Sequence, residues 1–302
     1  MPKILNSFIS FESCPVCLSS NFRTFKQGTF DLLRLNKNQI KITDSDYGKI
    51  WDLSRCESCG HVFANPSPSP EFIQSLYSKI EDPLYEEEAR GRARNFQKIL
   101  SRLEKIHPDK GRLFDVGAAT GILLSLAKKR GWHVEGVEPS TWAIKVAEKK
   151  YHIKINQGAF ETLPLKSNYY TAVTMVDIIE HTPCAFEAVS KAHEILAPGG
   201  TLCMVTPDIQ SLAAKLMGSR WWHYRPAHLA YFSFGSLSRL LNRAGFRIIK
   251  VRKYSWTFSA LYLLSRKPYF KFLIKSPFLA SFWGKFSIKL ALGDSFEVYA
   301  KK

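Results

Sequence analysis

The chain has 302 residues, 45% of them hydrophobic, and a formal net charge of +17. This length suits one full α/β domain with a smaller unit beside it, and the composition is that of a globular protein with a sizeable core. The excess of positive charge either forms a solvated basic face or favours contact with phosphates, nucleic acid or an anionic membrane.

The hydropathy of the chain excludes two kinds of segment. No run reaches the roughly 18 uncharged apolar residues that a membrane-spanning helix needs. The N-terminal stretch MPKILNSFISFESCPVC lacks the apolar run and small-residue cleavage site of a signal peptide. We therefore expect a cytoplasmic protein, with peripheral attachment to a membrane as an open option.

Residues 1–65 contain two C-x-x-C pairs and are expected to form a small zinc-binding domain. The four cysteines are Cys14, Cys17, Cys56 and Cys59. Each C-x-x-C turn presents two thiolates to one metal, and Gly60 frees the backbone to curl around the sulfur. Two such turns predict a closed tetrahedral site for structural Zn²⁺, against the alternative of two unrelated reduced pairs. His61 is expected to be a bystander.

Residues 66–110 are expected to form a helical linker or lid. The proline-rich stretch Asn65 to Pro70 blocks helix formation, and a helix then runs from Glu71 to Tyr77. A second helix is predicted from Glu86 to Ile106, where apolar residues recur at helical spacing.

From residue 111 to 302 the pattern alternates between strand and helix. Strands are predicted at 113–116, 133–137, 172–176, 201–205, 246–253 and 296–300, and helices at 122–129, 142–150, 186–196 and 234–244. This alternation predicts a mostly parallel sheet with right-handed crossovers.

The segment Asp115-Val116-Gly117-Ala118-Ala119-Thr120-Gly121 lies between a predicted strand and a predicted helix, where α/β sheets bind nucleotide-like ligands. Glu138 ends the next strand, at the place where an acidic side chain takes ribose hydroxyls. A third element, Gly158 to Glu161, could close over a flat base. The nicotinamide fingerprint G-x-G-x-x-G is absent, which argues against a dehydrogenase.

The stretches LFDVGAATG, GVEPS, DIIEHT and ILAPGGTLCMVTPD resemble the class I S-adenosylmethionine (SAM)-dependent methyltransferases, in particular the subgroup similar to ubiquinone-pathway O-methyltransferases. The resemblance implies a Rossmann-like, mostly parallel seven-stranded sheet beside a small zinc-ribbon-like domain. It also implies a cofactor-binding set of Asp115, Gly117, Ala119, Gly121, Glu138, Phe160, Glu161 and Asp177. At Ala118-Ala119 the subgroup often has Cys-Gly, so the fit of this loop to SAM is in question.

Three residues are candidates for catalysis. His181 and His228 lie in loops at the predicted carboxyl edge of the sheet, and a neutral histidine suits removal of a hydroxyl proton at pH 7. Glu180 precedes His181, and with Asp177 these residues resemble a motif linked to a divalent metal in quinone-type O-methyltransferases. Either a second metal binds there, or these residues cap the next helix and orient the acceptor. Cys184 follows a proline, but its context does not fit the cytosine C5-methyltransferases.

Residues 255–292 interrupt the step to the last strand and are read as an insertion. Lys and Arg recur among aromatic and aliphatic residues, with no acidic residue between them. This pattern fits an amphipathic membrane anchor, a lid over a long or lipid-linked acceptor, or a pair of core-packing helices with a solvated basic face.

The sequence as a whole therefore predicts a SAM-dependent methyltransferase that acts, at oxygen, on a small-molecule, saccharide or lipid-linked acceptor. Besides this acceptor, an anionic membrane is an open option as a partner that the protein contacts peripherally. Two alternatives remain. One is an RNA methyltransferase, suggested by the charge and the cysteine pairs, and the other is a membrane- or partner-binding protein that holds SAM without catalysis.

Overall fold

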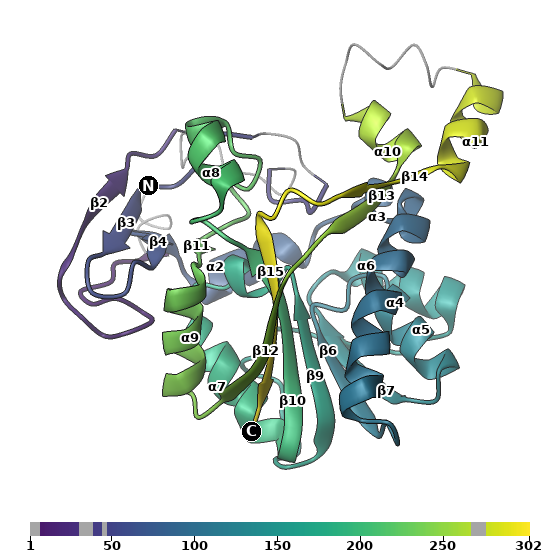
Figure 1. The fold of residues 1–302 in the computed structure, drawn as a ribbon, viewed down its shortest axis with the longest axis horizontal. Helices are drawn as coiled ribbons and strands as arrows, with labels where there is room; N and C mark the ends of the chain where they lie inside the picture. The colour runs from purple at the N-terminus through teal and green to yellow at the C-terminus, as the bar shows by residue number, and fades with distance from the viewer. Residues whose placement is uncertain (1–6, 30–38, 44–46, 267–275) are drawn as a thin grey trace.

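The computed structural model describes residues 7–29, 39–43, 47–266 and 276–302. A seven-stranded sheet forms its centre (Figure 1). In spatial order the strands are β12 (Arg247–Lys253), β15 (Ser295–Lys301), β10 (Leu196–Pro207), β9 (Tyr170–Val176), β6 (Arg112–Val116), β7 (His133–Glu138) and β8 (Asn156–Gln157). β15 runs antiparallel to both neighbours, whereas β10, β9, β6, β7 and β8 pair in parallel. The predicted Rossmann-like, mostly parallel seven-stranded sheet is thus confirmed.

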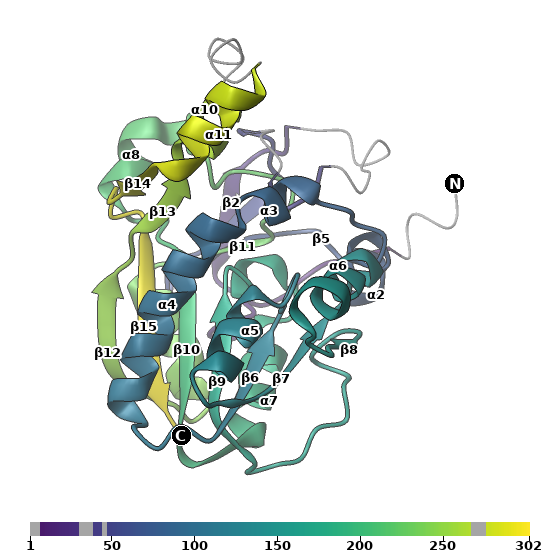
Figure 2. The ribbon, with the colours of Figure 1, turned by 90° about the vertical axis from the view of Figure 1, so that its right-hand side faces the viewer.

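Helices cover both faces of the sheet, as the two views show (Figures 1 and 2). One face packs against α7 (Ala185–Ile195) and α9 (Phe234–Arg243), and the other against α4 (Ala89–Ile106) and α5 (Ile122–Lys129). Alternate side chains of β10 enter the two cores: Leu202 and Met204 one, Cys203 and Val205 the other. This alternation follows from the period of two in a strand, and burial on both faces explains the continuous apolar runs of the sequence.

Two predicted helices differ from the observed ones. The helix expected at 86–106 is divided into α3 (Pro83–Glu87) and α4, because the non-helical Glu88 turns its carboxylate to accept from the backbone N–H of Ser259. The helix expected at 142–150 begins as α6 (Thr141–Val146) and ends in a π-turn at Ala147–Tyr151. That turn closes where His152 adopts a left-handed backbone.

The N-terminal residues build a second, smaller sheet of four strands. Its spatial order is β11 (Ala230–Tyr231), β4 (Val62–Ala64), β3 (Leu53–Cys56) and β2 (Phe22–Lys26). A two-stranded piece, β1 (Phe8–Ile9) with β5 (Ser67–Pro68), lies beside it. β11 belongs to the C-terminal part of the chain, so this sheet is completed by a strand from beyond residue 65.

The remaining elements lie around the carboxyl edge of the large sheet. They are α2 (Pro70–Tyr77), the 3-10 turn Ile179–His181, α8 (Leu212–Met217), the 3-10 turn Gly218–Arg220, β13 (Trp256–Ser259), α10 (Ala260–Ser265), α11 (Pro277–Lys285) and β14 (Ser287–Leu290). None of the helices in the described ranges combines the length and the hydropathy needed to cross a bilayer. Lys267, Lys271 and Lys275 of the predicted insertion lie outside the described residues.

Candidate functional site

A cavity of about 480 Å³ opens at the carboxyl edge of the large sheet. This volume lies in the range of small-molecule sites. Its wall contains six of the residues predicted to bind the cofactor or take part in catalysis: Gly117, Glu138, Phe160, Glu161, Asp177 and His181. Four different loops that follow strands contribute them, which is the arrangement expected of a ligand site in a parallel α/β sheet.

The turn after β6 begins at Gly117, and the geometry of this turn explains why the residue is a glycine. Gly117 has φ +67°, and a Cβ there would lie 2.1 Å from Cδ1 of Ile178. A side chain here would therefore need both a strained left-handed backbone and a shift of the Ile178 side chain. Gly121 ends the turn as the N-cap of α5 and does not line the cavity.

Glu138 holds this turn in place. One carboxylate oxygen accepts from the backbone N–H of Ala119 at 2.9 Å, and the other accepts from the N–H of Ser140 at 2.8 Å. Ala119 has φ +45°, an unusual conformation for a residue with a Cβ. The side chain that fixes the loop is thus Glu138, whereas Asp115 accepts from the hydroxyl of Thr174 on β9 at 2.5 Å.

Three carboxyls lie at the ends of adjacent strands, those of the buried Asp115 and Glu138 and of the half-buried Asp177. Burial raises the pKa of Asp115, of Glu138 and of Asp177 to about 7 each. Hydrogen bonds to the carboxylate oppose this rise for Asp115 and Glu138, and the positive charge of Arg92 opposes it for Asp177. Asp177 also has φ +54°, and its Oδ1 is buried with no hydrogen-bond partner in the described chain. Strain and an unpaired carboxylate oxygen at one residue point to a ligand site.

His181 lines the cavity with a defined tautomer. Its Nδ1 lies 2.8 Å from the carbonyl oxygen of Ala227 and 3.0 Å from the hydroxyl oxygen of Tyr77. A carbonyl can only accept, so Nδ1 carries the proton and Nε2 keeps its lone pair. Burial lowers the pKa of His181 to about 3, which keeps the ring neutral at physiological pH.

Glu180 and His228 lie behind His181. The rings of His181 and His228 are 4.8 Å apart, and one ligand atom from each of Glu180, His181 and His228 falls within 4.8 Å of the others. Glu180 Oε2 accepts from the hydroxyl of Thr206 at 2.9 Å. Glu180 Oε1 and His228 Nδ1 are buried and lack a partner among residues 7–29, 39–43, 47–266 and 276–302. The predicted catalytic residues therefore form one cluster, of which His181 alone reaches the cavity wall.

The contribution of α2 to the cavity is not visible in the sequence. Ile73, Gln74 and Tyr77 line the cavity, and the Tyr77 hydroxyl contacts His181. The helix was predicted, and its segment was expected to act as a linker or lid, but no motif marks which of its faces meets the site. Cys184 also lines the cavity, and burial raises the pKa of its thiol to about 11, so it is protonated at neutral pH.

The two cysteine pairs converge on one point. Sγ of Cys14 lies 3.6 Å from Sγ of Cys59, Sγ of Cys17 lies 3.5 Å from Sγ of Cys56, and all four sulfurs fall within 4.8 Å of one another. Tetrahedral Zn–S bonds of about 2.3 Å place sulfurs about 3.8 Å apart. The contact with the Cys59 thiol lowers the pKa of Cys14 to about 5, so one sulfur is readily a thiolate. This geometry fits a zinc-ribbon-like element.

The cysteine-bearing sheet braces the loop that carries His228. β4 pairs with β11 directly after this loop, and Leu229 at its end accepts from the N–H of Ala64 at 2.8 Å. Trp51 Nε1 donates to the carbonyl of Pro226 at 2.8 Å. The buried ring of His61 packs on Phe232 with ring centroids 4.7 Å apart. A structural link thus runs from the cysteines to the candidate catalytic residues.

Comparison with known families agrees with this geometry. The profile of a family described as a methyltransferase domain matches residues 85–251, more than half of the chain, so the chain belongs to this family.

Individual relatives are distant. The chain is 23% identical over 233 residues to 2-methyl-6-phytyl-1,4-hydroquinone methyltransferase of Arabidopsis thaliana, covering 71% of this chain and 65% of that protein. It is 24% identical over 156 residues to a ubiquinone biosynthesis O-methyltransferase of Azorhizobium caulinodans, covering 47% of this chain and 62% of that protein. The matched region thus spans less than two-thirds of each relative. A crystal structure from Thermotoga maritima, titled a SAM-dependent methyltransferase and possible histamine N-methyltransferase, aligns with a TM-score of 0.47 at 22% identity, over 71% of this chain and 90% of that one.

Proposed function

We propose that this protein is a SAM-dependent methyltransferase that methylates an oxygen atom of a small, saccharide or lipid-linked acceptor. The observation that carries the proposal is the pair of carboxyls that line one cavity at the carboxyl edge of the sheet, Glu138 and Asp177, with the buried Asp115 at the end of the strand between theirs. Family membership and the names of the two relatives support the reaction class. Both names support a quinol-like acceptor, and the second, that of an O-methyltransferase, supports transfer to oxygen.

The residues present fit this cofactor. Gly158 lines the cavity, and a Cβ there would meet no atom within 4 Å, so the wall is open at this point. The unpaired Oδ1 of Asp177 suits a cationic group, and Glu138 offers remaining lone pairs to ribose hydroxyls. Phe160 and Glu161 also line the cavity, and we assign them to the adenine ring. When bound, SAM supplies a methyl group on a sulfonium that leaves as a neutral thioether.

His181 is the proposed general base. Its Nδ1–H is fixed by the carbonyl of Ala227, so Nε2 can take a proton from an acceptor hydroxyl. Nδ1–H of His181 is the donor in the contact with Tyr77, so the Tyr77 oxygen accepts that hydrogen bond. The hydroxyl proton of Tyr77 is then free to be donated to an oxygen of the methyl acceptor. Glu180 and His228, which lie behind His181, would hold its ring in position. The cysteine cluster is proposed to hold structural Zn²⁺ through Cys14, Cys17, Cys56 and Cys59.

The cofactor assignment is tested by calorimetry of SAM binding at pH 7 in two buffers of different ionisation enthalpy. A cation beside carboxyls whose pKa lies near 7 lowers that pKa, so binding should release protons. S-adenosylhomocysteine lacks the sulfonium charge and should release fewer. Asp177→Asn should weaken SAM binding by about 1–3 kcal/mol, as expected for a lost polar contact to a buried ligand. Glu148→Gln on the exposed π-turn is the matched control, and equal affinities of the two variants would refute the assignment.

The reaction is tested with methyl-labelled SAM and a fractionated extract of the source cells. Label in the lipid, saccharide or small-molecule fraction supports the proposal, and His181→Ala should reduce its rate by roughly 10²–10⁴-fold while leaving SAM affinity unchanged. Label in RNA would instead establish the RNA methyltransferase alternative. SAM binding without label in any fraction would favour a non-catalytic role.

A further inference from the structure

A two-stranded arm rises from the carboxyl edge of the large sheet. β13 leaves after β12, β14 returns just before β15, and α10 and α11 lie at the far end (Figures 1 and 2). The register places the end of β12 and the start of β15 beside the end of β10, because Lys253 pairs with Phe296 and Pro207 with Ser295. The arm therefore starts from the same edge as the candidate active site.

The arm carries exposed apolar side chains on one line. Phe278, Phe282 and Phe286 follow at a spacing of four residues, which places them on one face at α11 and its C-cap. Their exposed fractions are 78%, 44% and 50%. Ile288 and Leu292, in and after β14, are exposed as well. Apolar side chains gathered in this way on a surface mark an interaction site rather than chance exposure.

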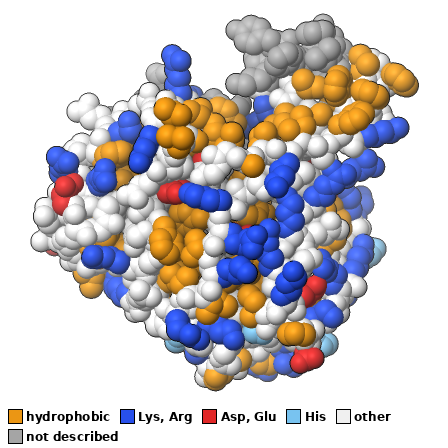
Figure 3. Space-filling model, in the orientation of Figure 1, with side chains coloured by type: hydrophobic (Ala, Val, Ile, Leu, Met, Phe, Trp, Pro, Cys, Tyr) orange, Lys and Arg blue, Asp and Glu red, His pale blue; other side chains and the backbone are white. Residues whose placement is uncertain are grey.

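A second exposed apolar pair lies at the same end of the molecule. Leu212 and Leu216 of α8 are 70% and 78% exposed, again four residues apart. α8 directly follows β10, and both ribbon views place α8 at the same end as α10 and α11. Figure 3 shows hydrophobic side chains gathered at both places, over α8 and over the arm.

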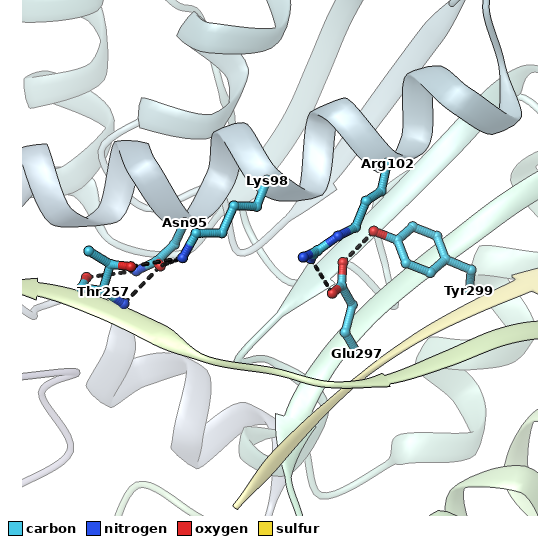
Figure 4. Close-up of polar contacts among 6 residues, drawn as sticks. All are labelled: Asn95, Lys98, Arg102, Thr257, Glu297 and Tyr299. Carbon is cyan, nitrogen blue, oxygen red and sulfur yellow. Dashed lines mark hydrogen bonds and ion pairs between the residues drawn. The ribbon is translucent and has the colours of Figure 1, made fainter. Parts of the chain in front are cut away.

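The arm is held firmly although its ribbon is short. An isolated pair of strands is marginal in water, so its position needs outside support. α4 provides it: Asn95 exchanges two hydrogen bonds with the backbone of Thr257, both of 2.9 Å, and Lys98 donates to the Thr257 hydroxyl at 2.8 Å (Figure 4). Glu88 accepts from the N–H of Ser259 at 2.6 Å. The exposed phenylalanines are thus presented by a fixed element.

The charges of the arm and of α8 indicate which kind of partner this surface fits. The charged side chains in the described part of residues 254–293 are Arg266, Lys285 and Lys289, and those of residues 209–222, which contain α8, are Lys215 and Arg220; neither described stretch contains an acidic residue. Exposed Phe and Leu beside lysines, in segments that contain no carboxylate of their own, match the interface of an anionic bilayer, where apolar side chains enter the headgroup boundary and cations meet lipid phosphates.

We propose that the arm and α8 together form a docking surface for an anionic membrane. Stacking on single-stranded RNA would use aromatic rings, whereas four of the seven exposed apolar residues named for this surface are aliphatic, namely Leu212, Leu216, Ile288 and Leu292. A second copy of the chain would have to cover a surface of like positive charge with itself. Docking here turns the carboxyl edge of the sheet toward the bilayer and so favours a lipid-linked acceptor. This last step rests on the proposed function, but the docking itself does not.

The test is co-sedimentation of the full chain with vesicles of phosphatidylcholine, with and without about one-third phosphatidylglycerol. We expect binding to the anionic vesicles that is at least about tenfold stronger than to the neutral ones. Phe278→Ser with Phe282→Ser should abolish it, whereas Ile249→Ser with Val251→Ser, exposed apolar residues of β12, should not. Lys285→Glu should weaken it more than Lys128→Glu, which gives the same net charge from the exposed end of α5.

Three outcomes would overturn the proposal. The first is equal binding to both kinds of vesicle, or none. The second is an effect of Lys128→Glu as large as that of Lys285→Glu, which would mean attraction by net charge alone. The third is a change from dimer to monomer on Phe278→Ser with Phe282→Ser, which would assign the surface to a second copy. SAM affinity, measured by calorimetry on each variant, should stay unchanged, so a failure here is distinguishable from a failure of the proposed methyl transfer.

Discussion

Leu18 and Gly60 occupy equivalent positions in the two cysteine turns. Each follows the second cysteine, each has a left-handed backbone with φ of 63° and 72°, and each donates its N–H at 2.9 Å to the carbonyl of the first cysteine, Cys14 or Cys56. A left-handed conformation costs a residue with a side chain about 1–2 kcal/mol. The two turns therefore have the same geometry, but only the turn with Leu18 has the conformational cost, because Gly60 has no side chain.

This asymmetry predicts opposite effects of two substitutions. Leu18→Gly should raise the free energy of unfolding by about 0.5–1 kcal/mol, since relief of the left-handed backbone exceeds the entropy lost with glycine, and the exposed leucine gives up little packing. Gly60→Ala should lower it by about 1 kcal/mol through the backbone alone, because an added Cβ meets only a side-chain nitrogen of Gln210 at 3.9 Å. Urea unfolding measures both, and a destabilised Leu18→Gly variant would contradict the argument.

Asp115 gives a pH-dependent prediction. Its pKa of about 7 in the folded chain lies above that of an unfolded aspartate, so the folded state holds a proton that the unfolded state has lost. The contribution of Asp115 to stability therefore falls as the pH rises from about 4 to 7. Asp115→Asn keeps an acceptor for the Thr174 hydroxyl and removes the ionisable group. The free energy of unfolding of this variant, relative to that of the wild type, should therefore rise by on the order of 1 kcal/mol or more between pH 5 and pH 8.

Unfolding in urea at these two pH values, for the wild type, Asp115→Asn and the exposed-residue control Asp109→Asn, measures this difference. The control should follow the wild type at both pH values. Parallel behaviour of Asp115→Asn would show that Asp115 is ionised in the folded chain.

At this scale the sequence predicts residue types better than contacts. The spacing around Gly117 and the position of Glu138 at a strand end are visible in the sequence, and both residues line the cavity. The hydrogen bond from Ala119 to Glu138 is not visible, because it depends on how two adjacent βα turns are packed. The contact of Tyr77 with His181 joins residues 104 positions apart, and no local pattern encodes it.

Among the elements, α4 does more than cover the sheet. Its apolar face packs in the core, while Asn95, Lys98 and Arg102 form a row of polar contacts to β13 and β15 (Figure 4). Arg102 pairs with the buried carboxylate of Glu297, which also accepts from the hydroxyl of Tyr299. One helix thus fixes both the base of the arm and the last strand of the sheet.

Asn95→Ala tests this role. The substitution leaves the buried N–H and carbonyl of Thr257 without partners, which should cost about 1–3 kcal/mol of stability. Hydrogen exchange at Thr257 should accelerate, because the ribbon loses its support on α4. Gln97→Ala, on the exposed side of the same helix, is the control. Unchanged exchange at Thr257 in the Asn95 variant would show that the arm holds its position without α4.

The observed bounds of helices and strands agree with the predicted ones where the local sequence signals are strong. The helix at 122–129 was predicted with its observed bounds, since a glycine precedes it and basic residues end it. The break at Glu88 could not be predicted, because its cause is Ser259, far along the chain. The strand expected at 201–205 begins at Leu196 instead, with a register shift before Thr201 that accommodates Pro198 and two glycines.

For the whole molecule, the link between cysteines and active site predicts that metal loss has distant effects. Cys56→Ser should remove about one zinc per chain, measured by metal analysis, and lower the melting temperature. It should also reduce methyl transfer, because β4 then supports β11 and the His228 loop less firmly. Ser58→Ala in the same turn keeps all four sulfurs and should change neither quantity. A metal-free variant with full activity would show that the cysteine cluster does not support the active site.

Two regions were proposed from the sequence as separate units, residues 1–65 and residues 111–302. This division rests on composition and cysteine spacing, and it stays a prediction. What the sequence does not reveal is that the small sheet takes β11 from the larger region, since a two-residue strand carries no periodic signal. Short edge pairing of this kind is decided by tertiary packing rather than by local preference.

The pairing of β4 with β11 also sets an order of events during synthesis. Residue 64 leaves the ribosome about 166 residues before residue 230, which at ordinary translation speeds is a delay of roughly ten to thirty seconds. All four cysteines have emerged by then. We therefore expect metal capture to come first and to keep β3 and β4 together as a nascent hairpin, whose free edge pairs with β11 only after that strand has been synthesised.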